Sequence, residues 1–351
     1  MSDISHGGSI VLDGTFASKA TAAPTIWDDC SGTNVLDKWD GFWPTGASSA
    51  DYDMAYRATI RGIGMPHSRA SKYICGCAIG GDAFTGNNVM FWKARTASFP
   101  SYSYFSYYFR CDDNWTFGLG SPGDDNFKLW DYSTGTSPYG FPANWYFEYN
   151  PRMTSSSSTD QTFHLYDDEL GQSDQSLDGD GSAWWGTDGG MTNPMGGAWL
   201  KHEVEIKWTD QADGYVRFWE NNVLQKSYTT HTDLYAGTDR VEAIGGFVRS
   251  HDANNYMYWG GIYYDRFPMR VVLINNATYA SATIVEPLIP TAWSTTQITA
   301  TVNAGALSNG TVWAAYVPGG GVAPTVLGSF NLTDGGGGPA STATLMPQIA
   351  L

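Results

Sequence analysis

The chain has 351 residues, 42% of them hydrophobic, and a formal net charge of −16 from 19 basic and 35 acidic side chains. This charge repels nucleic acid phosphates and anionic lipids, so neither nucleic acid nor a membrane is an expected partner. Every apolar run is shorter than the roughly 20 residues needed to cross a bilayer. The opening MSDISHGGSIVLDG has neither the basic nor the apolar region of a signal peptide, so none is expected.

Aromatic residues and glycine dominate the composition, with 15 Trp, 21 Tyr, 16 Phe and 41 Gly. Long segments of Leu, Ala, Glu and Lys, which favour helices, are few. We therefore expect an all-β protein. The length exceeds that of one small domain and fits one large sandwich followed by a smaller module.

The four cysteines, Cys30, Cys75, Cys77 and Cys111, all lie in the first third of the chain. The Cys75 and Cys77 pair is too closely spaced for an ordinary disulfide, and no second pair has zinc-finger spacing. Because cysteine is among the most often buried residues, buried free thiols are a better prediction than a metal site.

Residues 1–25 contain one strand-like run, Ser9 to Leu12, followed by small residues from Ala17 to Thr25. We interpret this segment as an N-terminal arm that leads into a domain starting near Ile26. Both a plain linker and a clamp onto a neighbouring subunit fit the pattern.

Alternation with a period of two predicts strands through the middle of the chain. From residue 101 to 110 aromatic residues occupy both faces, so this strand is either covered on both sides or lines a groove. Clusters of Gly, Pro, Asp and Ser separate the next expected strands, and the polar stretch 167–197 is predicted to be a loop. Those strands span residues 126–132, 144–150 and 161–166.

The stretch from Trp199 to Tyr228 predicts three consecutive antiparallel strands. His202, Val204 and Ile206 alternate with charged residues, which indicates a half-buried strand. A turn at 209–214 and a chain reversal at Asn221-Asn222 separate it from two further strands. Extended segments are also expected at 240–249 and 256–267.

Several of these segments, read together, resemble the concanavalin A-like lectin/glucanase jelly roll, in particular LamG-like domains and the polysaccharide lyases built on that fold. The segments are YFSYYFR, NFKLW, WLKHEVEIKW followed by DGYVRFWENN, and WGGIYYDRF. The resemblance covers residues 26–268. It implies a sandwich of two antiparallel sheets, one of which is often concave and faces a glycan.

The remaining residues, 269–351, resemble an immunoglobulin-like module of the IPT/TIG type. The turn from Pro290 to Trp293 and the expected strands at 297–302 and 311–317 carry this likeness. A fall in charge content marks the boundary near Pro268. The resemblance implies a smaller C-terminal immunoglobulin-like β-sandwich that acts as a spacer or docking unit. Its final strand either completes the module or adds to a neighbour's sheet.

Glu203 and Glu205 are two residues apart, which places both on one strand face, as the acids of jelly-roll glucanases are. Those enzymes carry a third acid, whereas here Lys207 follows and Lys201 precedes. Alternating Lys and Glu is typical of a solvated strand face with cross-strand pairs. We therefore expect this face to be exposed to solvent and no residue of it to be catalytic.

A lyase needs a base, commonly Tyr or His, and a group that neutralises the substrate carboxylate. The available residues are His164, His202, His231, Tyr108 and Arg110, but the motifs of the alginate-lyase branch are absent from the sequence. His202 also falls on the apolar face of its strand, which indicates an interior residue. The sequence therefore predicts a protein that is not an enzyme.

Asp174, Asp178 and Asp180 offer oxygen ligands at alternating positions, with Gly179 at the turn. This is a partial match to a calcium loop, since Trp185 stands where an EF-hand has its bidentate Glu. Turns of this composition are usually solvated. A Ca²⁺ site remains the alternative, and Ca²⁺ is the one cofactor considered.

Tryptophans near acidic and amide residues are the best candidates for binding a glycan. The indole ring stacks on the C–H face of a sugar while polar groups bond its hydroxyls. Core packing and contacts with neighbouring subunits are the alternatives for the same residues. The candidates are Trp115, Trp130, Trp145, Trp184 and Trp185.

Three functions compete. The first is a non-catalytic adhesive protein of a larger assembly, such as a phage capsid decoration or tail protein, on a virion or extracellular surface with other subunits and glycans as partners. The second is a soluble carbohydrate-binding protein. The third is a polysaccharide lyase or glycoside hydrolase. The acidity, the expected arm and the lack of a signal peptide favour the first.

Overall fold

The structure is a computed structural model, and it describes the chain in segments. These are residues 1–43, 54–58, 63–78, 87–95, 102–113, 127–134, 143–151, 161–167, 184–185, 198–209, 211–230, 240–248, 255–334 and 343–344. Trp115, Asp174, Asp178 and Asp180 lie outside the described residues.

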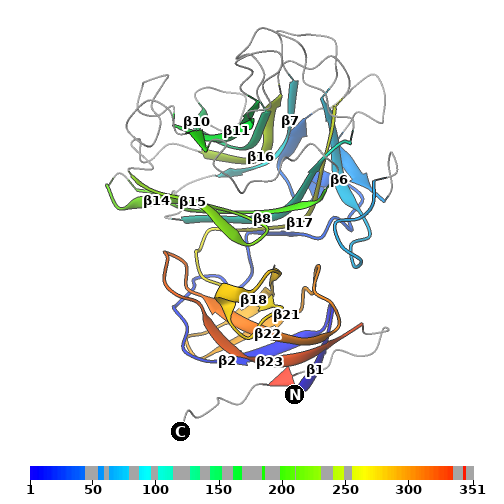
Figure 1. Ribbon diagram of the computed structural model, residues 1–351, viewed down its shortest axis with the longest axis vertical. Helices are drawn as coiled ribbons and strands as arrows, with labels where there is room; N and C mark the ends of the chain where they lie inside the picture. Colours follow the sequence, from blue (N-terminus) through cyan, green and yellow to red (C-terminus); the bar gives the residue numbers. More distant parts are fainter. Residues whose placement is uncertain are drawn as a thin grey trace.

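Two facing sheets form the larger domain (Figure 1). The eight-stranded sheet has the order β15-β14-β13-β8-β17-β6-β5, with β3 also paired to β17. Its strands are β3 (Ile26–Asp28), β5 (Ala55–Arg57), β6 (Tyr73–Ala78), β8 (Tyr102–Cys111), β13 (Leu200–Lys207), β14 (Gly214–Glu220), β15 (Val223–Thr230) and β17 (Asn255–Asp265).

The seven-stranded sheet has the order β12-β11-β10-β9-β16-β7-β4, and all its pairs are antiparallel. Its strands are β4 (Gly41–Trp43), β7 (Asn87–Arg95), β9 (Phe127–Thr134), β10 (Ala143–Pro151), β11 (Gln161–Asp167), β12 (Trp184–Trp185) and β16 (Arg240–Val248). The expected strands are confirmed within a few residues. The protein is an all-β, jelly-roll sandwich, and the described residues contain no helix other than two short 3₁₀ turns, η1 (Val35–Asp37) and η2 (Tyr279–Ser281).

The smaller domain is also built from two sheets. One has the order β1-β23-β22-β18-β19 and the other β20-β21-β2-β24. Its strands are β1 (Ser2–Ser5), β2 (Ser9–Asp13), β18 (Arg270–Ile274), β19 (Val285–Pro287), β20 (Ile289–Trp293), β21 (Gln297–Thr301), β22 (Gly310–Val317), β23 (Thr325–Thr333) and β24 (Ala343–Thr344). Its likeness to an IPT/TIG module stays a prediction.

The start of the chain belongs to this smaller domain (Figure 1). β1 pairs in parallel with β23, and β2 pairs with β21. Ile10 and Leu12 are buried in the core of the smaller domain. The first part of the expected arm is therefore two sheet strands, and only the segment from Gly14 to Thr25 crosses to the larger domain.

Local backbone conformation explains two features of the eight-stranded sheet. Asn221 and Asn222 both have positive φ, 49° and 64°, which is the turn geometry that a tight hairpin between β14 and β15 requires. Gly261, with φ 55°, lies in a bulge of β17. At this bulge β17 changes its partner from β6 to β3.

All four cysteines are buried and free, as predicted. Burial raises the pKa of Cys30 and Cys111, and neighbouring aspartates act in the same direction. These two thiols therefore stay protonated and pack as small apolar side chains.

β8 is buried on both faces, as its two-sided aromatic pattern indicates. Phe105, Tyr107 and Phe109 pack in the core of the larger domain. Tyr104 and Tyr108 point the other way, towards the smaller domain, where Tyr108 donates a hydrogen bond to Glu286. The eight-stranded sheet therefore lies between the jelly-roll core and the smaller domain (Figure 1).

The prediction of a solvated Lys and Glu face on β13 is wrong. Lys201, Glu203 and Glu205 are only 4%, 2% and 2% exposed because the smaller domain covers them. Glu205 accepts hydrogen bonds from the Arg270 Nη1 at 2.9 Å and from the Gly320 N–H at 2.8 Å. The alternating charges therefore form buried pairs between the two domains.

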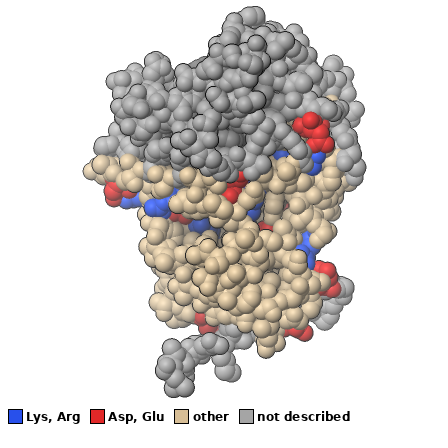
Figure 2. All heavy atoms as spheres, viewed as in Figure 1, with Lys and Arg blue, Asp and Glu red and all other residues tan. Residues whose placement is uncertain are grey.

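Glu286 of the smaller domain is the second centre of this interface. It accepts hydrogen bonds from Tyr108 and from the Ala306 N–H, and its Oε2 lies 3.8 Å from the Lys201 ammonium. Gly305 approaches Glu286 so closely that an added Cβ would lie 2.2 Å from its carboxyl carbon. Figure 2 shows lysine, arginine and acidic side chains at the surface along this junction on one face.

Two connections hold the domains at the edges of this interface. Lys19, in the crossing segment, pairs with Asp265 at 2.5 Å, and both side chains are buried. Burial raises the pKa of Asp265, and Lys19 acts in the opposite direction. Arg69 of the larger domain donates to the carbonyl of Gly305 at 3.1 Å and to Asp334 at 2.8 Å.

Because of two histidines at the domain junction, the protein is expected to lose stability in mild acid. Burial lowers the pKa of His6 and His67 below the usual value of 6.5, and His6 Nδ1 accepts a hydrogen bond from the Ala304 N–H. Between the folded and unfolded pKa values the unfolded chain binds more protons, so stability falls as the pH drops below about 6.5. The melting temperature is expected to fall between pH 7.5 and 5.5, and less steeply in His67→Gln. Equal slopes for the variant and the wild type would contradict this account.

Candidate functional site

One row of residues marks the inner face of the seven-stranded sheet. Phe91 and Ile244 are paired in register and are both buried in the core of the larger domain. Paired residues share a face, so the register places the whole row on the face that Phe91 and Ile244 occupy. From β4 to β11 it consists of Phe42, Phe91, Ile244, Trp130, Phe147 and Leu165.

The neighbouring row lies on the outer face, because successive residues of a strand alternate between faces. It runs across five strands in the order β7-β16-β9-β10-β11, in which β16 is out of sequence order. Three of its five positions are aromatic and one is acidic. From β7 to β11 the row consists of Trp92, Ala243, Asp131, Tyr146 and Tyr166.

A second outer row lies next to the first. Glu148 follows Tyr146 by two residues on β10 and so shares its face. It pairs with His164 on β11 and with Lys128 on β9, and His164 pairs with Trp184 on β12. A register shift between Phe147 and Glu148 allows this pairing. The register thereby places a lysine, a glutamate, a histidine and a tryptophan at paired positions of four adjacent strands.

Trp92 is the outer-row aromatic residue whose side chain is described. Its indole lies against Gly41 of the neighbouring strand, where an added Cβ would come within 2.1 Å of an indole carbon. Only glycine leaves room for the ring there. Trp92 is not among the residues predicted to bind a glycan, although its place directly after the inward-facing Phe91 is the signal that could have found it.

The predicted glycan-binding tryptophans divide between the two faces. The register places Trp184 in the outer row with His164, whereas Trp130 is in register with the buried Ile244. Trp145 is two residues before Phe147 on β10, so its register position is on the inner-row face. Trp185 pairs with Phe163, which is two residues before Leu165 on β11, so its position is on that face too. Of the four predicted tryptophans that lie within the described residues, the register therefore places one, Trp184, beside the acid and base residues.

The three residues considered for catalysis do not share one site. His202 is fully buried inside the larger domain, stacked on Phe109 with ring centroids 5.7 Å apart. This confirms the prediction of an interior histidine. Glu203 and Glu205 lie on the opposite face of β13, in the domain interface. An acid pair there faces the smaller domain and not a substrate groove.

Among the described residues, no group of three or more His, Cys, Asp or Glu residues is placed to hold a metal ion. The predicted Ca²⁺ ligands lie outside these residues, so the calcium site stays a prediction. Within the same part of the chain, no helix has the length and apolar character that crossing a membrane requires.

No known family model matches the sequence, and no curated protein does. Solved structures do resemble the fold. The endo-β-1,4-glucuronan lyase of the fungus Trichoderma reesei is 9% identical and superposes with a TM-score of 0.43 over 69% of this chain and 95% of its own. For the alginate lyase vAL-1 of a Chlorella virus the identity is 12%, the TM-score 0.41 and the coverage 68% and 99%.

A lectin domain is similar as well. The carbohydrate recognition domain of Emp46p, in its potassium-bound form, is 8% identical, with a TM-score of 0.38 over 68% of this chain and 94% of its own. These lyases and lectin domains share the concanavalin A-like jelly-roll fold. That lyases stand first among the similar structures contradicts the expectation that the protein is not an enzyme.

Proposed function

We propose that the protein binds a polysaccharide across the outer face of the seven-stranded sheet. The observation that supports this is the pair of adjacent outer rows, which combine aromatic residues with acidic, basic and imidazole-bearing ones. Carbohydrate sites require this combination, because sugars stack on aromatic rings and bond polar groups through their hydroxyls. From β7 to β12 the rows extend about 24 Å, given about 4.8 Å between strands. This span suits a chain of sugars better than a single one.

A second candidate function is cleavage of the bound chain. The pairing of His164, Glu148 and Lys128 in one register favours it. Glycan cleavage by elimination or hydrolysis needs a proton acceptor and a proton donor, and a cation stabilises an acidic sugar at the reacting carbon. Directly opposite residues on adjacent strands have Cβ atoms about 5 Å apart, close enough to act on one sugar residue. The virion function expected from the sequence has no support in the fold.

Binding is tested by affinity electrophoresis of the purified protein against a panel of neutral and acidic polysaccharides. At least one is expected to retard the protein, and Trp92→Ala is expected to weaken that binding by about tenfold, or about 1.4 kcal/mol. Gly41→Val should have a similar effect, because the added side chain displaces the indole. Trp199→Ala, which removes an indole directly before β13, is the matched control and should bind as the wild type does.

Cleavage is tested with the same panel by the absorbance of unsaturated uronates and by the release of reducing ends. If the protein cleaves one of these polysaccharides, His164→Ala should slow the cleavage by about 10²–10⁴-fold, the usual contribution of a general acid or base. Binding by the same variant should change far less. A protein that neither binds nor cuts any member of the panel would refute the proposed function.

A further inference from the structure

A cavity lies between the two domains, on the side of the eight-stranded sheet that faces away from the seven-stranded sheet. Its volume is about 1000 Å³, at the upper end of the range for ligand pockets. Four separate segments line it: the crossing segment at 21–25, Tyr102 at the start of β8, the domain junction at 266–269 and the loop at 318–322. Neither domain forms this pocket alone.

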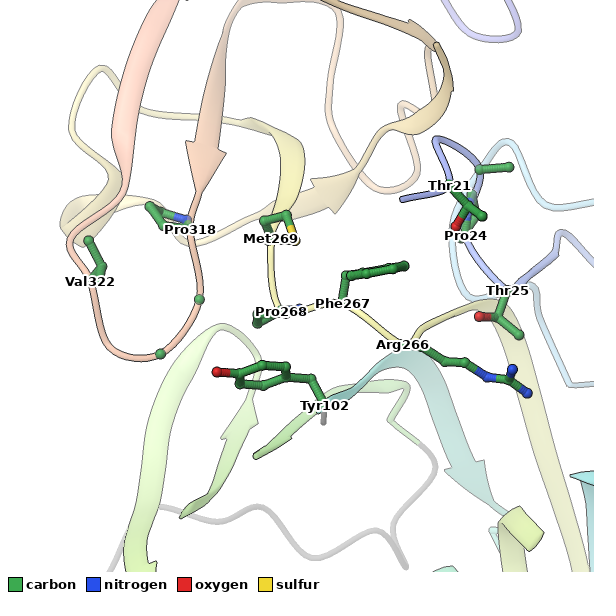
Figure 3. A pocket seen from close by; sticks show the side chains of 13 residues that line it. Thr21, Pro24, Thr25, Tyr102, Arg266, Phe267, Pro268, Met269, Pro318 and Val322 are labelled. Atoms are coloured by element: carbon green, nitrogen blue, oxygen red, sulfur yellow. The ribbon is translucent and has the colours of Figure 1, made fainter. Parts of the chain in front are cut away.

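The walls are mainly rings and other apolar groups. Figure 3 shows Phe267 and Pro268 above Tyr102, with Pro318 and Val322 towards one end. Aromatic and proline rings offer flat apolar surfaces, on which the C–H face of a sugar stacks. Val322 is 60% exposed, so that end of the pocket is open to solvent.

Arg266 is the one charged residue among those that line the pocket. It lies next to Thr25 at the other end from Val322 (Figure 3). Its Nε is buried and has no hydrogen-bond partner among the described residues. The nearby Lys19 is already neutralised by Asp265 at 2.5 Å. With Lys19 paired, Arg266 is the cation that the pocket offers to an anion, and the Thr21 and Thr25 hydroxyls can bond a polar ligand.

The loop that closes the pocket is held in place before any ligand binds. Gly319, Gly320 and Gly321 all have positive φ, between 63° and 80°. An added Cβ on Gly319 would lie 2.3 Å from Pro268, and the Gly320 N–H donates to the buried Glu205. The pocket is therefore largely preformed, so that binding costs little ordering of the chain.

We infer that this pocket binds a single acidic sugar unit, with its ring against Tyr102 and Phe267 and its anionic group on Arg266. One cation selects one negative charge, the rings select a flat C–H face, and the threonines select hydroxyls. The inference goes beyond the polysaccharide site proposed above, because the eight-stranded sheet and the core separate the two. Uronates and sulfated sugars share the required chemistry.

The inference is tested by calorimetric titration of the full chain with glucuronate, glucose 6-sulfate and glucose. At least one of the two acidic sugars is expected to bind, and glucose at least tenfold more weakly. The acidic sugar with the higher affinity shows whether the pocket prefers a carboxylate or a sulfate. Equal affinity for glucose, or no binding of either acid, would overturn the inference.

Variants tie the binding to this pocket. Arg266→Gln should weaken binding of the acidic sugar at least tenfold, and Arg266→Lys should restore part of it because the charge returns. Tyr102→Ala should weaken binding of all three sugars. Trp92→Ala, on the other side of the jelly roll, should leave these affinities unchanged, which separates this site from the proposed polysaccharide site. Unchanged binding by a folded Arg266→Gln would refute the assignment.

Discussion

Replacing Arg270 by methionine is expected to lower the free energy of unfolding by about 3–5 kcal/mol. The Arg270 side chain is 3% exposed and its Nη1 donates to Glu205 Oε2 at 2.9 Å. Without it, Glu205 remains buried beneath the smaller domain and loses its nearest charged partner. The Tyr215 hydroxyl and the Gly320 N–H still donate to Glu205, and the Arg217 guanidinium stays 3.6 Å from its Oε1, beyond hydrogen-bond distance. Urea denaturation of both proteins measures the difference.

Two further variants isolate the charge effect. Arg270→Met combined with Glu205→Gln should recover part of the lost stability, since no buried carboxylate is left unpaired. Lys93→Met breaks the ion pair between Lys93 and Asp40, whose N–O distance of 2.5 Å is close to that of the Arg270 pair. The two side chains are 28% and 38% exposed. That control should cost no more than about 1 kcal/mol. An Arg270→Met variant as stable as Lys93→Met would contradict the buried interface.

Asp28→Ala is expected to destabilise the protein by about 3–5 kcal/mol, because several buried donors lose one acceptor. Asp28 is fully buried on β3 and accepts from the Cys30 N–H at 2.9 Å, the Trp39 Nε1 at 2.8 Å and the Tyr56 hydroxyl at 2.7 Å. Burial raises the pKa of Tyr56, and Asp28 adds to the shift, so the phenol stays a donor. Thermal and urea unfolding measure the loss.

The next residue provides the control. Asp29 is exposed and bonds Ser31 and Lys38 at the surface, so Asp29→Ala should change the stability by no more than about 1 kcal/mol. Asp28→Asn keeps one acceptor oxygen and should fall between the two alanine variants. If Asp28→Ala unfolds at the same urea concentration as Asp29→Ala, then Asp28 does not hold the segments of Cys30, Trp39 and Tyr56 together.

The strands could be predicted because their signal is local. Alternation of side chains over eight or ten residues reports which face of a strand is buried, and β8 and β13 have nearly the predicted bounds. The Asn221-Asn222 reversal was equally local, since asparagine tolerates positive φ. The same reasoning found His202 inside the sandwich.

The candidate site could not be predicted in the same way. Its outer rows depend on the order β7-β16-β9-β10-β11-β12, in which β16 lies between strands from much earlier in the chain. Sequence spacing does not show that Trp92, Asp131 and Tyr146 belong to one row. In addition, the register shift between Phe147 and Glu148 means that simple alternation does not predict the pairing of Glu148 with Lys128.

By itself, the sequence determined the all-β class, the position of most strands, the buried thiols and which side of each strand is apolar. These properties follow from residue type and from the period-two geometry of an extended chain. Only the tertiary structure decided that Lys201, Glu203 and Glu205 are buried and that Arg266 lines a pocket. An alternating charged face looks the same in a sequence whether water or another domain covers it. Its environment depends on Arg270 and Glu286, more than 60 residues away in the chain, and only folding brings them into contact with it.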